Sequence, residues 1–153
     1  MRYFTLEELE HSDTATKYKI DNTSNGETRT NLIKLIELLL DPIRTKWGKP
    51  IKVNSGYRCS RLNRMVGGAS TSQHLLGEAA DITVGSSEEN KKLFEMILSM
   101  SNILFDQLIL EDGGKWIHIS LKWRVVSKNR REVLLGVRNS KGKMYYTKYQ
   151  KDK

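Results

Sequence analysis

An acidic residue, Asp81, stands in the middle of an apolar run that spans residues 79–84. The length and the composition of this run are typical of a buried strand. A carboxylate in such a strand would be buried, and an isolated buried charge is strongly unfavourable. The fold must therefore give Asp81 a partner. This partner is either a cation, such as a bound metal ion, or a set of backbone amides.

Two histidines, His74 and His118, also lie among apolar and small residues, so we expect both near the core. Two imidazoles and one carboxylate leave the fourth position of a zinc ion open for water, which is the catalytic arrangement. Zinc lowers the pKa of such a water to about 7. The alternative is that Asp81 caps backbone amides and that the histidines are ordinary core residues. The spacing alone leaves both possibilities open, and His11, in a polar segment, is expected to play no part.

The size of the chain favours a single domain over residues 1–153. Of its 153 residues, 38% are hydrophobic and 29% are charged, as in ordinary globular proteins. A chain of this length buries roughly 70% of the surface that its unfolded form exposes. Cys59 is the one cysteine, which excludes an internal disulfide and a cluster of thiolate ligands. We expect Cys59 to fill a small space rather than to react.

The apolar pattern predicts helices early in the chain and strands late in it. This is an α+β fold with helices packed on a central antiparallel sheet. The longest helix should span residues 27–47 and be kinked or split by Pro42. Residues 11–27 are polar and are expected to form an ordered loop. The other predicted helices are 5–10, 58–66 and 87–100, and the predicted strands are 51–53, 79–84, 105–111, 116–121, 132–138 and 144–149.

Three segments carry recognisable motifs. Residues 55–58 read Ser-Gly-Tyr-Arg and are followed by Leu-Asn at 62–63. Residues 72–81 read Ser-Gln-His-Leu-Leu-Gly-Glu-Ala-Ala-Asp, and residues 116–118 read Trp-Ile-His. In this order, they resemble the substrate-binding segment and the two metal signatures of the zinc D-alanyl-D-alanine carboxypeptidase family, which includes vancomycin-resistance D,D-dipeptidases and phage endopeptidases. Residues 4–22 resemble the phage-associated and cell-wall branch of that family.

The resemblance covers nearly the whole chain and implies a fold and a metal site. The fold would be the hedgehog-like fold of the zinc D-Ala-D-Ala peptidases, in one domain. The metal would be zinc, held by His74, Asp81 and His118. The implied activity is that of a carboxypeptidase or an endopeptidase, which hydrolyses a peptide bond in peptidoglycan stem peptides by zinc-activated water.

The resemblance also implies residues that contact the substrate. Arg58 resembles the arginine of the family that contacts the scissile carbonyl or a carboxylate, and the alternative is a surface arginine at the start of a helix. Tyr57, in the same segment, is expected to contact substrate. Ser72 is expected either to hydrogen-bond the substrate or to cap its own loop. Trp116 is expected either to line the pocket or simply to pack.

The general base is the point at which the chain departs from the family. The family places an acid three residues before the second metal histidine, where this chain has Lys115. The Gly-Gly pair at 113–114 predicts a two-residue turn, which pairs Glu111 with Trp116. Because cross-strand partners share a face and faces alternate, Glu111 then lies on the face of His118, while residues 112 and 115 point the other way. Glu111 is therefore the predicted base, and the alternative is a salt-bridged hairpin glutamate.

The chain is basic, with a formal net charge of +8 and a pI near 9.6. Lys and Arg are concentrated from residue 122 to the end. Such a surface attracts polyanions, which include nucleic acid, anionic membranes and the acidic polymers of bacterial walls. A solvated basic face is equally consistent with the pattern. A nucleic-acid-binding protein is suggested by charge alone, since no such motif is recognised and the tyrosines at 145, 146 and 149 are typical of hairpin packing.

The sequence therefore predicts a monomeric zinc peptidase whose partner is a peptidoglycan peptide, with no nucleic acid and no membrane. No run approaches the ~18 apolar residues of a membrane span. The N-terminus carries acids where a signal peptide needs an apolar run. We expect synthesis in the cytoplasm and action on the cell wall, as for an endolysin of a phage or prophage. The alternative, which Lys115 favours, is a non-catalytic wall-binding module that keeps the fold and the zinc.

Overall fold

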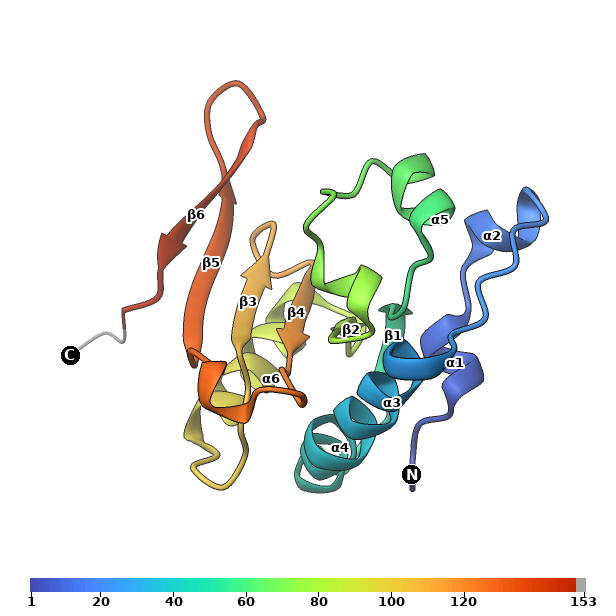
Figure 1. Ribbon diagram of the computed structural model, residues 1–153. Coiled ribbons are helices and arrows are strands. Elements are labelled where there is room, and N and C mark those ends of the chain that lie inside the picture. The colour runs from blue at the N-terminus through green and yellow to red at the C-terminus, as the bar shows by residue number, and fades with distance from the viewer. Residues whose placement is uncertain (151–153) are drawn as a thin grey trace.

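A six-stranded sheet with the strand order β1-β2-β4-β3-β5-β6 forms the centre of the fold (Figure 1). The computed structural model describes residues 1–150. Neighbouring strands are antiparallel except for β3 and β5, which are parallel. The strands are β1 Lys52–Ser55, β2 Ala79–Thr83, β3 Gln107–Glu111, β4 Trp116–Ser120, β5 Glu132–Arg138 and β6 Met144–Lys148.

The prediction of an α+β fold is confirmed, but the prediction of a purely antiparallel sheet is wrong at one pair. After β4, residues 121–131 pass around the start of β3 and enter β5 on its far side. Backbone hydrogen bonds from Arg131 to Phe105 at 3.2 Å and from Glu132 to Asp106 at 2.9 Å fix this entry. β5 runs antiparallel to β4, as in a hairpin, but β3 lies between them. The neighbour of β5 is therefore parallel to it.

The two faces of the sheet differ because side chains alternate along each strand. One face packs in the main core against α6 Ser87–Ser99 and the N-terminal helices. The opposite face carries Asp81 on β2, His118 on β4 and Glu111 on β3. The buried residues of β2, β3 and β4 in the main core are Ala80, Ile82, Leu108, Leu110, Ile117 and Ile119.

The long helix predicted over residues 27–47 forms without a break. Its middle is a wider π-helical turn that ends two residues before Pro42. Proline lacks an N–H and its ring crowds the preceding turn, and a π-helical turn gives the backbone additional room. Leu40 and Asp41 keep α-helical dihedral angles, so Pro42 does not split the helix. The three parts are α3 Gly26–Leu35, η1 Ile36–Leu40 and α4 Asp41–Trp47.

Residues 11–27, predicted as an ordered loop, include a short helix, α2 Asp13–Lys17. Ser12 caps it by accepting a hydrogen bond from the backbone N–H of Ala15 at 3.2 Å. Ala15 is its one buried residue, so the segment lacks the apolar repeat from which a helix is predicted. Within residues 1–150, no helix is long and apolar enough to cross a membrane. The remaining short helices are α1 Leu6–Glu10, α5 Ser60–Met65, η2 Gln73–Leu76 and η3 Val126–Lys128.

The loop before β2 is held against α3 by a close backbone contact. Its last turn, η2, ends at Gly77, which has a φ of +72°. A Cβ atom at Gly77 would lie 2.4 Å from the carbonyl oxygen of Thr28 on α3. From the same helix, the Asn31 side chain donates to the carbonyl of Leu76 at 2.9 Å. Gly77 is therefore needed for its positive φ and for its lack of a side chain.

We expect Gly77→Ala to lower the free energy of unfolding by about 2–4 kcal/mol, because it adds a backbone clash to a left-handed conformation. The matched control is Gly142→Ala, where φ is +79° but nothing lies within 4 Å of the added Cβ. This control should lose only about 1 kcal/mol. Chemical denaturation of both variants measures the difference, and equal losses would contradict the close approach.

Candidate metal centre

Asp81 and His118 are direct cross-strand partners in the pair of β2 and β4. Nδ1 of His118 lies 3.1 Å from Oδ1 of Asp81, and Nε2 of His74 lies 3.3 Å from Oδ2 of the same carboxylate. One potential ligand atom from each residue lies within 4.8 Å of the other two. The structure therefore brings together the three side chains that the sequence singled out. We refer to His74, Asp81 and His118 as the metal cluster.

His74 reaches the metal cluster from η2. Ser72 caps this turn by accepting a hydrogen bond from the backbone N–H of His74 at 3.2 Å. Nδ1 of His74 lies 2.6 Å from the carbonyl oxygen of Gly56. A carbonyl oxygen only accepts, so Nδ1 carries a hydrogen, and Nε2, which faces Asp81, is the nitrogen that would bind a metal. His74 is buried, so this orientation is held within the fold.

The charge of Asp81 is balanced by the two imidazoles. Burial raises the pKa of Asp81, but the charges and hydrogen bonds of His74 and His118 outweigh it and lower the pKa well below its usual range. Within residues 1–150, the close polar contacts of the carboxylate are with these two rings. The alternative in which Asp81 caps backbone amides is therefore not what the structure contains. The ionised carboxylate stabilises positive charge between the imidazoles.

The donor set of the metal cluster fits a divalent metal ion. Imidazole nitrogen and carboxylate oxygen are zinc ligands, and three of them leave one position free. The second nitrogen of each ring faces an acceptor: the Gly56 carbonyl for His74, and Oε1 of Gln73, at 3.5 Å, for His118. Metal-ligating histidines have partners of this kind on the nitrogen that does not bind the metal.

Glu111 lies on the face of the sheet that carries His118, as the predicted register requires. Glu111 pairs with Trp116, and Ile109 pairs with His118. The turn itself differs from the prediction, because residues 112–115 form a four-residue loop instead of a two-residue turn. The N–H of residue 115 closes this loop by donating to the carbonyl of Glu111 at 2.9 Å. The longer loop leaves the register unchanged.

The carboxyl group of Glu111 is buried, with only 7% of the residue exposed. Its Oε1 has no hydrogen-bond partner among the described residues. Burial raises the pKa of Glu111, and its interactions with Tyr146 and His118 oppose the rise. A buried carboxyl with a raised pKa and a free lone pair is suited to accept and return a proton.

Tyr146 on β6 reaches Glu111 across β5. Its cross-strand partner is Gly136. A Cβ atom at Gly136 would lie 2.7 Å from Oε1 of Glu111 and 3.1 Å from Cε1 of Tyr146, so the glycine leaves the space that the two side chains share. Burial and hydrogen bonding to Glu111 raise the pKa of Tyr146 to about 12. From the sequence alone, Tyr146 is assigned to hairpin packing. Its contact with Glu111 depends on β5 lying beside β3, which local pattern does not predict.

Lys115 occupies the position where the family has an acid, and it forms an ion pair within the loop of residues 112–115. Its Nζ lies 3.2 Å from Oδ2 of Asp112. The Arg138 guanidinium binds the same carboxylate through Nε at 3.0 Å and Nη2 at 3.1 Å. Hydrogen bonding to Arg138, helped by Lys115, lowers the pKa of Asp112. Asp112 is therefore held as a paired carboxylate, in contrast to Glu111.

Arg58 and Ser72 lie beside the metal cluster. The backbone N–H of Arg58 donates to the carbonyl of His74 at 3.1 Å, and its Nη2 donates to Oγ of Ser72 at 3.2 Å. Nε of Arg58 is buried and has no partner among residues 1–150. Burial lowers the pKa of Arg58, and the charge of Asp81 opposes the shift. With Tyr57, Arg58 lines a hollow of about 310 Å³.

The structure places Tyr57 and Trp116 at different edges of this region. Tyr57 packs partly against the main core, and burial raises the pKa of its hydroxyl, which lies beside Thr28. Trp116 is half-buried and pairs with Glu111. The substrate roles assigned to both residues stay predictions. His11 forms an exposed contact with a neighbouring aspartate at 3.1 Å and is not part of the metal cluster.

Comparison with known proteins agrees with this geometry. Over 38 residues, the chain is 55% identical to the enzyme named zinc D-Ala-D-Ala carboxypeptidase from Streptomyces albus G. That match spans 25% of this chain but only 15% of the length of the Streptomyces enzyme. A family model described as Peptidase M15 matches residues 2–120, which is most of the chain and includes every residue of the metal cluster. This chain therefore belongs to the peptidase M15 family.

Proposed function

We propose that this chain is a zinc-dependent peptidase that hydrolyses a peptide bond in peptidoglycan stem peptides, at a bond that involves D-alanine. The observation that carries the proposal is the meeting of two histidines and Asp81 beside the buried carboxyl of Glu111. Membership of the peptidase M15 family supports the reaction class. The name of the Streptomyces relative supports D-alanine in the substrate.

His74, Asp81 and His118 would hold the metal ion, and zinc is the ion that the family and the donor set imply. A zinc ion with three protein ligands activates water at neutral pH and polarises a carbonyl oxygen. The chain contributes the direction of each ring. His74 would present Nε2 to the metal because its Nδ1 is hydrogen-bonded to a backbone carbonyl.

Glu111 is the proposed general base. Its carboxylate would accept a proton from the attacking water and return it to the nitrogen of the leaving amine. The free lone pair of Oε1 and the raised pKa of the carboxyl support this role. Tyr146 holds the carboxylate from the side of β6, since its hydroxyl is within hydrogen-bonding reach of Glu111.

Arg58 is proposed to bind the carbonyl oxygen or a carboxylate of the substrate. A guanidinium with unused donors can donate a hydrogen bond to a carbonyl oxygen or a pair of hydrogen bonds to a carboxylate, and Nε of Arg58 is unused among the described residues. Ser72 orients the guanidinium through its hydrogen bond to Nη2. Tyr57 and Trp116 are proposed to line the substrate site, Tyr57 at the hollow beside Arg58.

We further propose the hedgehog-like fold of the zinc D-Ala-D-Ala peptidases in one domain over residues 1–153, acting as a monomer on the cell wall. Residues 151–153, the end of the basic segment, lie outside the described residues. The remaining basic residues would hold the enzyme near anionic wall polymers. A phage or prophage origin, with release at lysis, rests on the resemblance of residues 4–22 to the phage-associated branch.

The alternative function is a zinc-containing wall-binding module without catalysis. The observation that favours it is Lys115, which stands where the family has an acid and is paired with Asp112. In that case Glu111 would be a buried structural carboxyl. The two functions differ in turnover and not in wall affinity.

Mass spectrometry of purified muropeptides after incubation with zinc-loaded protein tests the proposal. We expect the loss of a mass that corresponds to the released fragment, and the fragment identifies the bond and separates carboxypeptidase from endopeptidase cleavage. Removal of zinc by a chelator should stop the reaction, and added zinc should restore it. Unchanged muropeptides with tight binding to the wall would favour the binding module.

Glu111→Gln should lower turnover by a factor on the order of 10²–10⁴, the usual contribution of a general base. Asp112→Asn is the matched control, because Asp112 is the adjacent carboxylate and is already paired with Arg138 and Lys115. Its turnover should stay near that of the parent protein. Zinc content measured in each variant shows that the metal site is intact. Equal turnover in Glu111→Gln and the parent would exclude Glu111 as the base.

Gly136→Ala should lower turnover while the protein stays folded and keeps its zinc. The added Cβ would lie 2.7 Å from Oε1 of Glu111, the end of a flexible side chain, so the carboxylate must move. The loss should approach about 10²-fold, since a small displacement of a catalytic group is costly. Steady-state kinetics and thermal unfolding measure the two effects. A variant that unfolds early but retains its turnover when folded would argue against this geometry.

A further inference from the structure

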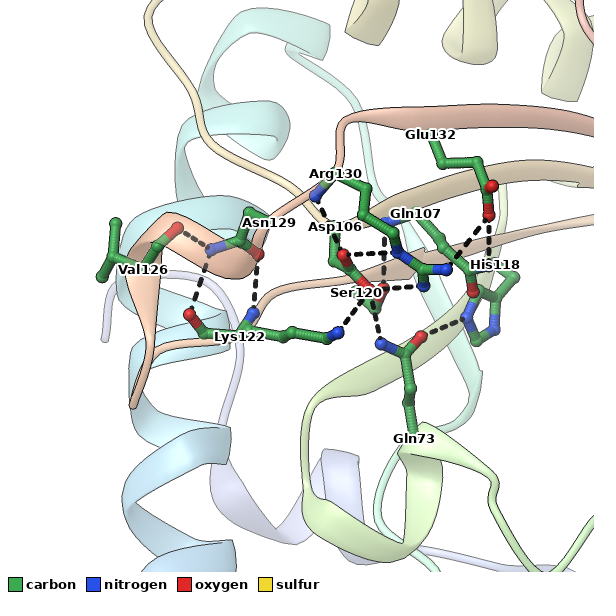
Figure 2. A network of polar contacts seen from close by, with 10 residues as sticks. All are labelled: Gln73, Asp106, Gln107, His118, Ser120, Lys122, Val126, Asn129, Arg130 and Glu132. Carbon is green, nitrogen blue, oxygen red and sulfur yellow. Dashed lines mark hydrogen bonds and ion pairs between the residues drawn. The ribbon is translucent and has the colours of Figure 1, made fainter.

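Asp106 is a fully buried carboxylate and is surrounded by donors, as Figure 2 shows. Arg130 donates to it from its backbone N–H at 3.0 Å, from Nε at 3.0 Å and from Nη2 at 2.8 Å. Lys122 adds a cation at 3.7 Å. Burial alone would raise the pKa of Asp106, but the bonds from Arg130 outweigh it and lower the pKa to about 2. Asp106 is therefore an acceptor at neutral pH.

This carboxylate fixes the orientation of the Gln73 amide. Nε2 of Gln73 donates to Oδ2 of Asp106 at 2.8 Å. The reverse orientation would set the amide oxygen against an ionised carboxylate, and neither atom could donate. The amide oxygen must therefore point away from Asp106. In Figure 2 it points toward His118, and Oε1 lies 3.5 Å from Nε2 of the ring.

The orientation of the amide selects one tautomer of His118. An amide oxygen only accepts, so the facing Nε2 of His118 carries the hydrogen. Nδ1, which lies 3.1 Å from Asp81, is then the nitrogen that would bind the metal. We propose that Gln73 is a positioning residue that fixes His118 with Nδ1 toward the metal, an inference that rests on the proposed function of His118 as a ligand.

The position of Gln73 in the chain strengthens this assignment. It is the first residue of η2 and directly precedes His74. One turn thus provides a ligand and the side chain that orients another ligand on β4. The two rings are held in opposite senses, His74 by a backbone carbonyl on Nδ1 and His118 by an amide on Nε2. They would present Nε2 and Nδ1 to the metal respectively.

The direct test is a long-range ¹H–¹⁵N spectrum of zinc-loaded protein labelled at histidine. We expect His118 to bind zinc through Nδ1 and to carry a hydrogen on Nε2. Ligation through Nε2 would overturn the role of Gln73 and leave the metal site intact. If the protein binds no zinc, the proposed function fails, and the same spectrum without metal still tests the inference: a hydrogen on Nε2 supports it, and an Nε2 without a hydrogen refutes it.

A pair of variants supplies a second readout. Gln73→Met removes the amide and keeps the length of the side chain, and we expect zinc affinity to fall about 10–100-fold, as for other outer-shell partners of metal-bound histidines. The control is Gln107→Met, because the Gln107 amide also donates to a carboxylate, Glu132 at 2.7 Å, in the same network. Competition with a chromophoric chelator measures both affinities. An unchanged affinity in Gln73→Met, or an equal loss in Gln107→Met, would overturn the proposal.

Discussion

The antiparallel pairing of β2 with β4 is the constraint on which the site depends. It sets Asp81 directly across from His118 and, through the alternation of side chains, turns both away from the helical core. A carboxylate is tolerated there because two imidazoles lie beside it. The imidazoles in turn have acceptors behind them, a backbone carbonyl for His74 and an amide oxygen for His118. Loss of one member leaves another buried polar group without a partner, which is costly.

Two buried carboxylates, Asp106 and Glu111, have different pKa values and different roles because their surroundings differ. Asp106 has several donors, with Arg130 contributing most, and its pKa falls to about 2 despite full burial. Glu111 has fewer compensating contacts, and its pKa rises. The first is an ionised support for the loop that carries Gln73 and the connection that leads into β5. The second keeps the capacity to exchange a proton, which a fully paired carboxylate would lose.

Those features of the fold and of the site that depend on local sequence pattern could be predicted from the sequence. Asp81 inside an apolar run predicted a buried charge with a partner, and the Gly-Gly signal gave the register of Glu111 although the loop is longer. The motifs indicated the family and its zinc, which the comparisons bear out. The parallel neighbour of β5 depends on the path of residues 121–131, which local pattern does not encode. Gln73 and Tyr146 were missed for a related reason, since their partners lie on distant strands.

The last strand, β6, forms one of the two edges of the sheet, and most of its side chains are exposed. A free edge presents unpaired backbone donors and acceptors to any other extended chain. Here Lys143 flanks the strand and Lys148 ends it. Two copies that met edge to edge would bring these like charges together, and lysines at edges discourage such pairing. The charge of the hairpin therefore acts against self-association at high local concentration, independently of any polymer that it attracts.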